Sequence, residues 1–446
     1  MNHPGLDLCQ SPLATIPDAL GQLLRGAWLD PESGLPIGVP VLAVAIERSL
    51  AGMEAELVAP LPLGRRFAVV SDATTQRVLG ARVTRAVASL GAIVPVVLGA
   101  KPHADAETAE RLRRACAAAD TLVAVGSGTI NDLCKYAAAK DGKPYIVFAT
   151  APSMNGYASM NAALTVNGHK KTLPAAAPLG VFVDLKVLAA APARMIQAGL
   201  GDSLCRSTAQ ADWLLSKQLL GTPYRHAPFA LLAADEPALL ESPEALLRGD
   251  LDAMRALART LVLSGLGMTI CHGSHPASQG EHLISHYIDM FAPDTRAAFF
   301  HGEQVAVATL TMARIQETML AGPPPRVASG SITREDLQRR FGADTGHACW
   351  SEYSVKRLTE EAANDLSARI AHTWDATCAA LRRVMIPAAT IAEVMARAGC
   401  PRTPGELGVT PEFYARAVHD ARFLRDRYTF LDLAADAGRL AALQPA

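Results

Sequence analysis

The chain has 446 residues, a net charge of -1 and hydrophobic side chains at 50% of its positions, enough for two or three domains with large cores. This balanced charge, without a basic stripe, argues against nucleic acid or an anionic membrane surface as the main partner. The 8 cysteines form no C-x-x-C pair, and neither a signal-peptide pattern nor an apolar run of transmembrane length is present, so we expect a cytoplasmic protein with reduced thiols.

The first 60 residues are predicted to be a partly helical lead-in to the domain that follows. Ile16 to Leu29 and Val39 to Leu57 both show helical periodicity, and a segment rich in Gly and Pro separates them. We expect these helices to pack on the next domain rather than to form one of their own.

From Arg66 onward, short apolar segments alternate with helical ones. Strands are predicted at residues 67–72, 93–98, 121–125, 145–148 and 180–184, and helices at 78–90, 106–119 and 133–138. Asp105 is placed to cap the second of these helices. Such alternation predicts a parallel sheet with helices on both faces, which we assign to a domain of residues 1–190.

After about Pro192 the strand signals end and helical periods dominate. Helices are predicted at residues 193–198, 203–217, 246–266, 280–290, 302–318, 359–383 and 387–398. Residues 321–332, with three consecutive prolines, are predicted to be a loop or an insertion. We therefore expect an α-helical second domain over residues 191–446.

A glycine-rich segment follows the third predicted strand and begins a helix. Its residues are Gly126, Ser127, Gly128, Thr129 and Ile130. Small residues at a helix N-terminus allow a phosphate to approach free N–H groups and the positive end of the helix dipole. The segment lacks the usual G-x-G-x-x-G spacing, and an ordinary strand-to-helix turn explains it about equally well.

A second polar loop follows the fourth predicted strand and begins with Thr150, Ala151, Pro152, Ser153, Met154 and Asn155, continuing to Ser159. Because parallel strands end at the same edge of a sheet, this loop should lie beside the glycine-rich segment. Its hydroxyl and amide groups could bind a nicotinamide, a ribose or a substrate hydroxyl. Taken alone, an ordinary turn is the better interpretation, as is a solvated surface for Lys170 and Lys171.

Three histidines and one aspartate form the candidate metal site. His282 and His286 are four residues apart, so on a helix they share one face, and His301 begins the next helical segment after a predicted loop at residues 292–294. Imidazoles together with a carboxylate are typical metal ligands, and Asp202 is the candidate carboxylate. Taken alone, Asp202 would more often cap a helix, and each histidine would more often be structural.

Seven sequence blocks between Gly126 and Ala434 resemble the sn-glycerol-1-phosphate dehydrogenase family, a branch of the iron-containing alcohol dehydrogenase and dehydroquinate synthase-like superfamily. The blocks are G-S-G-T-I-N-D, T-A-P-S-M-N-G-Y-A-S, A-P-A-R-M-I-Q-A-G-L-G-D, A-D-W, S-x-P-A-S-x-G-E-H-L-I-S-H, H-G-E-Q-V and R-D-R-Y-T-F-L-D-L-A. They cover most of the chain, and they are specific as a set although no single block is.

The resemblance implies a Rossmann-like domain, a helical domain and an active site in the cleft between them. It implies NAD or NADP bound by residues 126–130, 150–153 and Ser159, and a divalent metal, zinc with nickel or iron as alternatives, on Asp202, His282 and His301. It places the catalytic His286 near the substrate rather than on the metal, and Asn155 in the substrate pocket. The implied reaction interconverts dihydroxyacetone phosphate and sn-glycerol 1-phosphate by hydride transfer, in a homo-oligomer.

The chain departs from the family at three positions near the expected substrate. Asn155 replaces the usual aspartate, His275 replaces a common arginine, and Gln279 replaces a small residue. These changes alter charge and hydrogen bonding, so the substrate stays open. The alternatives are a dehydrogenase of an unphosphorylated polyol, a dehydroquinate synthase-like lyase on the same fold, and a non-enzymatic nucleotide- or metal-binding protein.

Overall fold

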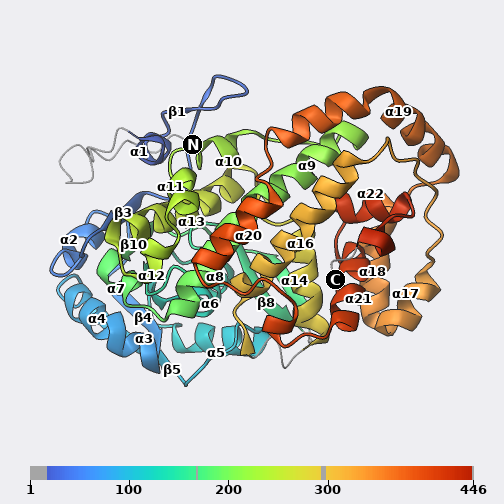
Figure 1. Ribbon diagram of the computed structural model, residues 1–446. Helices are drawn as coiled ribbons and strands as arrows, with labels where there is room; N and C mark the ends of the chain where they lie inside the picture. The colour runs from blue at the N-terminus through green and yellow to red at the C-terminus, as the bar shows by residue number, and fades with distance from the viewer. Residues whose placement is uncertain (1–17, 167–168, 293–297, 444–446) are drawn as a thin grey trace.

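A computed structural model describes residues 18–166, 169–292 and 298–443 of the chain. The half that contains the large sheet and the half built from helices lie side by side, with the helices of residues 334–382 farthest from the sheet (Figure 1). The predicted loop after the helix of His282 falls partly on Pro293 and Asp294, which lie outside the described residues.

The large sheet has six strands, all of them parallel, in the order β3-β10-β7-β6-β4-β5. The strands are β3 (Ala43–Glu47), β4 (Arg66–Asp72), β5 (Ala92–Leu98), β6 (Thr121–Gly126), β7 (Tyr145–Ala149) and β10 (Gly180–Asp184). The five strands expected from the sequence are all present, and the prediction of a parallel sheet is confirmed.

Helices cover both faces of this sheet, as its alternating residues require. In β6, Leu122 and Ala124 join the core that includes α5 (Ala106–Ala115) and α6 (Gly128–Asp141). Val123 and Val125 of the same strand join the core on the opposite face. The helices of that face are α2 (Glu54–Val58) and α4 (Ala81–Val87), and α4 is preceded by α3 (Ala73–Thr75) and a π-helical turn. Asp105 caps α5, as predicted.

The prediction of a helix over Val39 to Leu57 is wrong in its first part. Residues 43–47 form the edge strand β3, and α2 covers only the last part of the segment. A short apolar run suits a buried strand as well as a helix, and the partner strand β10 lies more than a hundred residues later in the chain. In the earlier segment, the described residues from 18 onward form the short helix α1 (Ala19–Leu24) and then β1 (Trp28–Leu29), which pairs in a hairpin with β2 (Pro36–Ile37).

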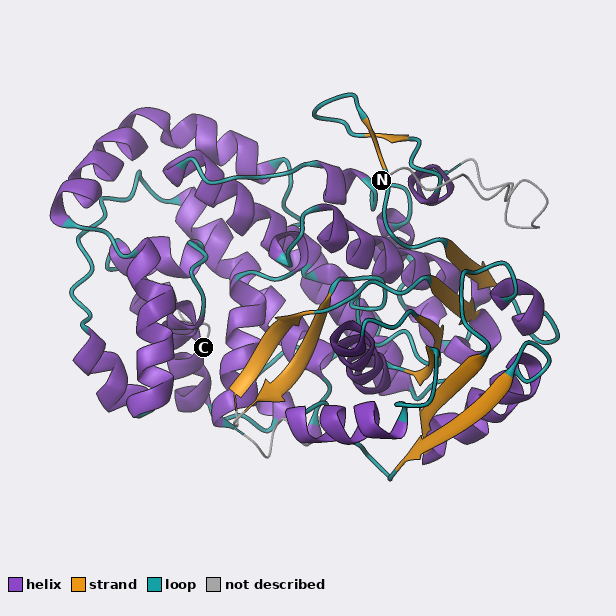
Figure 2. Cartoon of the chain, turned by 180° about the vertical axis from the view of Figure 1, so that it is seen from behind, coloured by secondary structure: helices purple, strands orange, loops and turns teal. Residues whose placement is uncertain are grey.

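A separate antiparallel hairpin, for which the sequence analysis gave no prediction, connects the two halves. Its strands are β8 (Asn161–Val166) and β9 (His169–Pro174). β8 packs on α6 and β9 packs on α14 (Gly280–Phe291), so the hairpin lies between the sheet and the helical half (Figure 2). Lys171 on β9 is exposed, which fits a solvated surface.

The rest of the chain is helical, which confirms the predicted fold class. The helices besides α14 are α7 (Leu185–Ala189), α8 (Ala193–Leu204), α9 (Arg206–Leu220), α10 (Ala227–Ala230), α11 (Glu236–Glu241), α12 (Glu244–Leu247), α13 (Leu251–Ile270), α16 (His301–Ala321), α17 (Arg334–Phe341), α18 (Ala343–Lys356), α19 (Glu360–Arg382), α20 (Ala388–Arg397), α21 (Pro411–Asp420) and α22 (Phe430–Asp436). Among the described helices, none combines the length and the apolar character needed to span a membrane.

A buried carboxylate on α9 joins three other helices. One oxygen of Asp212 accepts the N–H of Gly280, the first residue of α14, at 3.0 Å. The other accepts the N–H of Phe430, the first residue of α22, at 2.9 Å, and the amide of Gln316 on α16 at 3.2 Å. Asp212 is fully buried, so all three donors depend on it rather than on water.

We therefore expect Asp212→Ala to lower the free energy of unfolding by about 3 kcal/mol or more, because it leaves the buried N–H groups of Gly280 and Phe430 without an acceptor, while Gln316 keeps only the carbonyl oxygen of Thr208. Urea unfolding followed by circular dichroism would measure the change. The matched control is Asp365→Ala on α19, which removes an exposed carboxylate and should leave the midpoint unchanged. Equal midpoints for the two variants would contradict the role of Asp212.

Candidate active site

The two polar loops predicted from the sequence lie side by side at the carboxyl edge of the sheet. β6 ends at Gly126 and β7 ends at Ala149, and the N–H of Thr150 donates to the carbonyl oxygen of Gly126 at 3.2 Å. Both loops border a cavity of about 290 Å³ that also reaches α8, α14 and the start of α16.

Five of the ten residues predicted to bind the cofactor line this cavity. They are Ser127, Gly128, Thr129, Ser153 and Ser159. The other five shape the loops behind it: Gly126, Ile130, Thr150, Ala151 and Pro152. At Gly126 a Cβ atom would meet the Ile130 side chain at 2.5 Å, so only glycine allows this turn. Because α6 begins at Gly128, its N-terminal N–H groups lie at the cavity, where an anionic group could bind them.

Lys135 is a supporting residue that the sequence analysis missed. It is fully buried on α6, and its ammonium group donates to the carbonyl oxygens of Gly156 at 2.6 Å and Asn161 at 2.9 Å and to the hydroxyl of Ser159 at 3.0 Å. Burial lowers the pKa of Lys135 to about 8, while nearby Asp132 opposes that shift. Lys135 thus fixes the second loop against α6, through acceptors that no local pattern reveals.

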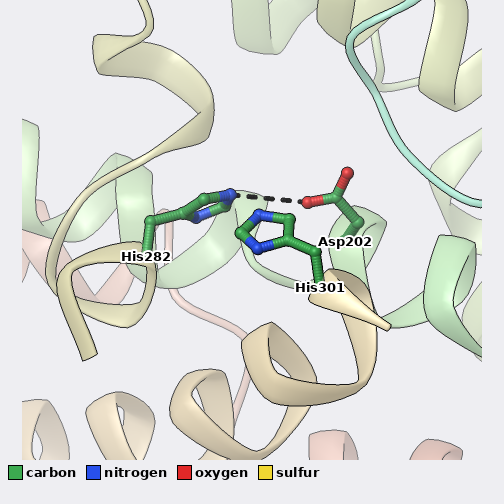
Figure 3. A group of neighbouring side chains, drawn as sticks. All are labelled: Asp202, His282 and His301. Carbon is green, nitrogen blue, oxygen red and sulfur yellow. Dashed lines mark ion pairs between the residues drawn. The ribbon is translucent and has the colours of Figure 1, made fainter. Parts of the chain in front are cut away.

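Asp202, His282 and His301 come together at the helical side of the cavity (Figure 3). They lie on α8, α14 and α16, and one ligand atom from each lies within 4.8 Å of the others. His282 Nε2 is 3.5 Å from Asp202 Oδ1. Asp202 and His282 are buried and His301 is half-buried, so the group is accessible from the cavity without being open to bulk water.

Two glycines allow the helices of Asp202 and His301 to pack backbone against backbone. A Cβ atom at Gly302 would lie 2.0 Å from the carbonyl oxygen of Ala198, and one at Gly201 would lie 2.4 Å from that of Gly302. The sequence analysis left Asp202 between two predicted helices, where it could cap the second, and this is wrong because Asp202 is inside α8. The neighbouring glycines suggested a break in the helix, but they serve its close contact with α16.

Each member of this group has a hydrogen-bond partner outside the group that orients it. Asp202 Oδ2 accepts the N–H of Asn155 at 2.7 Å. Glu281 Oε1 lies 2.9 Å from His282 Nδ1, and the Ser285 hydroxyl lies 3.2 Å from His301 Nδ1. Partners at Nδ1 leave Nε2 as the ligand atom, which is the usual arrangement around a metal-binding histidine.

The arrangement fits a divalent cation. Asp202 Oδ1 is buried and accepts no hydrogen bond, a costly state for a carboxylate oxygen unless a cation lies beside it. Burial alone would lower the pKa of His282, but its contacts with Asp202, Cys205 and Glu281 raise it well above the usual range. Surroundings that attract a proton so strongly also attract a metal ion, and two imidazoles with one carboxylate suit several divalent metals.

Cys205 belongs to a second cluster with Glu281 and His282, but its chemistry differs. Burial raises the pKa of its thiol to about 12, so the thiol stays protonated at neutral pH. Its sulfur lies 3.0 Å from the carbonyl oxygen of Asp202. Because metals bind the thiolate, we place Cys205 behind the site rather than among its ligands.

Of three further residues singled out in the sequence, His286 and Asn155 line the cavity, and His275 packs on an aromatic ring. His286 lines the cavity, its ring 5.9 Å from that of His301. Asn155 also lines it, exposes only 9% of its surface, and has an Nδ2 group without a hydrogen-bond partner. His275 instead stacks on Trp213 at 5.6 Å, and burial lowers its pKa to about 4, so it is neutral at pH 7.

Comparison with known proteins agrees with this geometry. A family model described as iron-containing alcohol dehydrogenase matches residues 45–192. A Bacillus licheniformis protein named glycerol-1-phosphate dehydrogenase (NAD(P)+) is 30% identical over 387 residues, which cover 85% of each chain. The chain belongs to the glycerol-1-phosphate dehydrogenase family. A relative of the same name from Bacillus velezensis is 32% identical over 314 residues, covering 70% of this chain and 69% of that protein.

Solved structures support the fold. The structure of glycerol dehydrogenase from Schizosaccharomyces pombe matches with a TM-score of 0.58 at 18% identity, over 91% of this chain and 90% of that one. At this identity the similarity concerns the architecture, and it confirms the fold that the sequence resemblance implied.

Removal of either central ligand should empty the metal site. We expect Asp202→Ala and His282→Ala each to lose bound divalent metal, measured by elemental analysis of the purified protein, because two donors do not hold the ion. Binding of the dinucleotide, measured by its fluorescence, should be largely intact. His347→Ala, which removes an exposed histidine, is the control and should keep its metal. Full metal content in either site variant would refute the assignment.

Proposed function

We propose that this protein is a metal-dependent, NAD(P)-linked dehydrogenase that interconverts dihydroxyacetone phosphate and sn-glycerol 1-phosphate. The observation that carries the proposal is the Asp202, His282 and His301 group, which borders the same cavity as the N-terminus of α6. Membership of the glycerol-1-phosphate dehydrogenase family supports the same reaction.

The dinucleotide would bind along the carboxyl edge of the sheet. Ser127, Gly128 and Thr129 would hold its pyrophosphate through the free N–H groups of α6, and Ser153 and Ser159 would contact its nicotinamide ribose. Lys135 and Tyr157 keep the second loop in place, since the Tyr157 hydroxyl donates to the carbonyl oxygen of Ala151 at 2.6 Å. The bound cofactor supplies the hydride, and these residues supply its position.

A divalent ion, with zinc as first candidate and nickel or iron as alternatives, would be held by Asp202, His282 and His301 and would supply Lewis-acid polarisation of the substrate oxygen. Asn155 Nδ2 is a donor at the cavity wall and would orient a substrate oxygen. His286 would exchange the proton of the substrate hydroxyl with water. Because Asn155 is neutral, the loop of residues 150–159 brings no carboxylate to the cavity.

The same family membership supports three further proposals, which concern the domain boundary, the oligomeric state and the location of the protein. We place the boundary between the sheet domain and the helical domain near residue 190, where α7 ends and α8 begins. We also propose a homo-oligomer and a cytoplasmic location.

A spectrophotometric assay tests the proposed reaction. We expect the metal-loaded protein to oxidise NADH or NADPH with dihydroxyacetone phosphate, and to lose this activity when a chelator removes the metal. Activity with unphosphorylated dihydroxyacetone alone would instead identify a polyol dehydrogenase. Turnover of neither ketone would show that Asn155 and His275 have redirected the site to another carbonyl substrate.

A side chain at Gly128 should block the cofactor specifically. A Cβ atom there would meet only Met154, at 3.4 Å, so Gly128→Val should fold while its methyl groups occupy the space at the start of α6. We expect the dissociation constant for NADH to rise about 10-fold or more, with the metal content unchanged. Gly99→Val, at an exposed glycine outside the cavity, is the control. Unchanged affinity in Gly128→Val would place the cofactor elsewhere.

A further inference from the structure

Two arginines lie behind one wall of the cavity and have no part in the metal or cofactor sites. Arg425 and Arg427 belong to the segment that precedes α22. Arg427 donates to the carbonyl oxygen of Ser278, and also to the hydroxyl of Ser274 at 2.8 Å. Arg425 donates to the hydroxyl of Thr172 on β9 at 3.0 Å. All three of these partners line the cavity, so both guanidinium groups adjoin its surface.

The described residues hold neither arginine in a direct ion pair, although acidic side chains act on Arg427 from farther away. Within the described part of the chain, no carboxylate oxygen lies within 4.0 Å of either guanidinium group. Arg422, only a few residues earlier, shows the contrast, with Asp432 at 3.8 Å and Asp436 at 3.6 Å. Burial and the positive charge of Arg425 together lower the pKa of Arg427 to about 10, against the opposing effect of the carboxylates of Asp426, Glu281 and Glu352, and Arg427 stays cationic at neutral pH. An anion beside the pair would relieve both effects.

The segment that carries the arginines is held rigidly. Thr429 caps α22 through a reciprocal pair of hydrogen bonds with Asp432, and the N–H of Phe430 donates to Asp212. Both serine partners of Arg427, Ser274 and Ser278, lie close to His275 in the chain. His275 adds no charge to this wall, because its ring is neutral and stacks on Trp213. The cationic character of this wall therefore comes from Arg425 and Arg427.

We propose that Arg425 and Arg427, together with the hydroxyls of Thr172, Ser274 and Ser278, bind the phosphate group of the substrate. The proposal rests on the proposed function, which supplies a triose phosphate. Guanidinium groups and hydroxyls are strong donors to phosphate oxygens, and the site is prepared before the ligand arrives. The N-terminus of α6 already offers a separate site for the pyrophosphate of the cofactor, which leaves this wall for a second phosphate.

Steady-state kinetics of the metal-loaded variants Arg427→Met and Arg425→Met test the proposal. We expect the KM for dihydroxyacetone phosphate to rise about 10- to 100-fold in Arg427→Met and about 10-fold in Arg425→Met. Their KM values for NADH and NADPH should not change. Any turnover of unphosphorylated dihydroxyacetone should also stay at the wild-type level. Arg402→Met, which removes an exposed arginine that does not line the cavity, is the matched control.

These kinetic results can contradict the phosphate subsite without contradicting the proposed reaction. A KM for dihydroxyacetone phosphate within about 2-fold of wild type in both variants overturns the subsite but not the reaction. A rise confined to the KM for NADPH also overturns it, since the arginines would then bind a cofactor phosphate. If Arg427→Met does not fold, Arg425→Met decides alone.

If the wild-type protein turns over neither ketone, the proposed function fails, and calorimetric titration with inorganic phosphate tests the arginines directly. Binding by wild type and Arg402→Met, with at least a 10-fold loss in both site variants, supports an anion site on this wall. Equal binding, or none by wild type, overturns it.

Discussion

The buried carboxylates Asp212 and Glu281 determine where the site histidines lie. Asp212 fixes the first residue of α14 through the N–H of Gly280, and Glu281 on that helix orients the ring of His282. Glu281 also accepts the hydroxyl of Thr208 on α9 at 3.2 Å, so both carboxylates join the same two helices. Burial, with the nearby Glu281, raises the pKa of Asp212 to about 8. Buried polar groups of this kind are costly unless they are hydrogen-bonded, and here the partners are the backbone and side chains that position the site.

Backbone contact supplies the second constraint. Asp202 and His301 lie beside Gly201 and Gly302, the residues at which α8 and α16 touch. At such a crossing the helices cannot shift without a collision, so the distance between carboxylate and imidazole is set by main chain rather than by flexible side chains. The ion pair between Arg194 on α8 and Glu303 on α16, at 2.7 Å, holds the same crossing from its more exposed side. A metal site proposed for this group would therefore be prepared in advance of the ion.

The sequence predicted what depends on local pattern and missed what depends on distant partners. The alternation of strands and helices and the two polar loops follow from neighbouring residues, and all of them are present. The edge strand β3 was predicted as a helix, because its partner β10 is remote and a five-residue apolar run has no clear period. Lys135 looks like any lysine on a helix until the loop it holds is in place. Asp202 was expected between two helices, because a glycine needed for packing looks in the sequence like a glycine that ends a helix.

The arrangement of charge in the cavity explains how one site can select and orient its substrate. Asp202 and Asp132 line it together with His282 and His301, the candidate metal ligands, whereas Arg425 and Arg427 adjoin its walls at Thr172, Ser274 and Ser278. A molecule with a carbonyl group at one end and an anion at the other can satisfy both regions in only one direction. Binding energy gained at the anion would then hold the carbonyl carbon in place for hydride transfer, so a ketone that lacks the anion loses orientation as well as affinity.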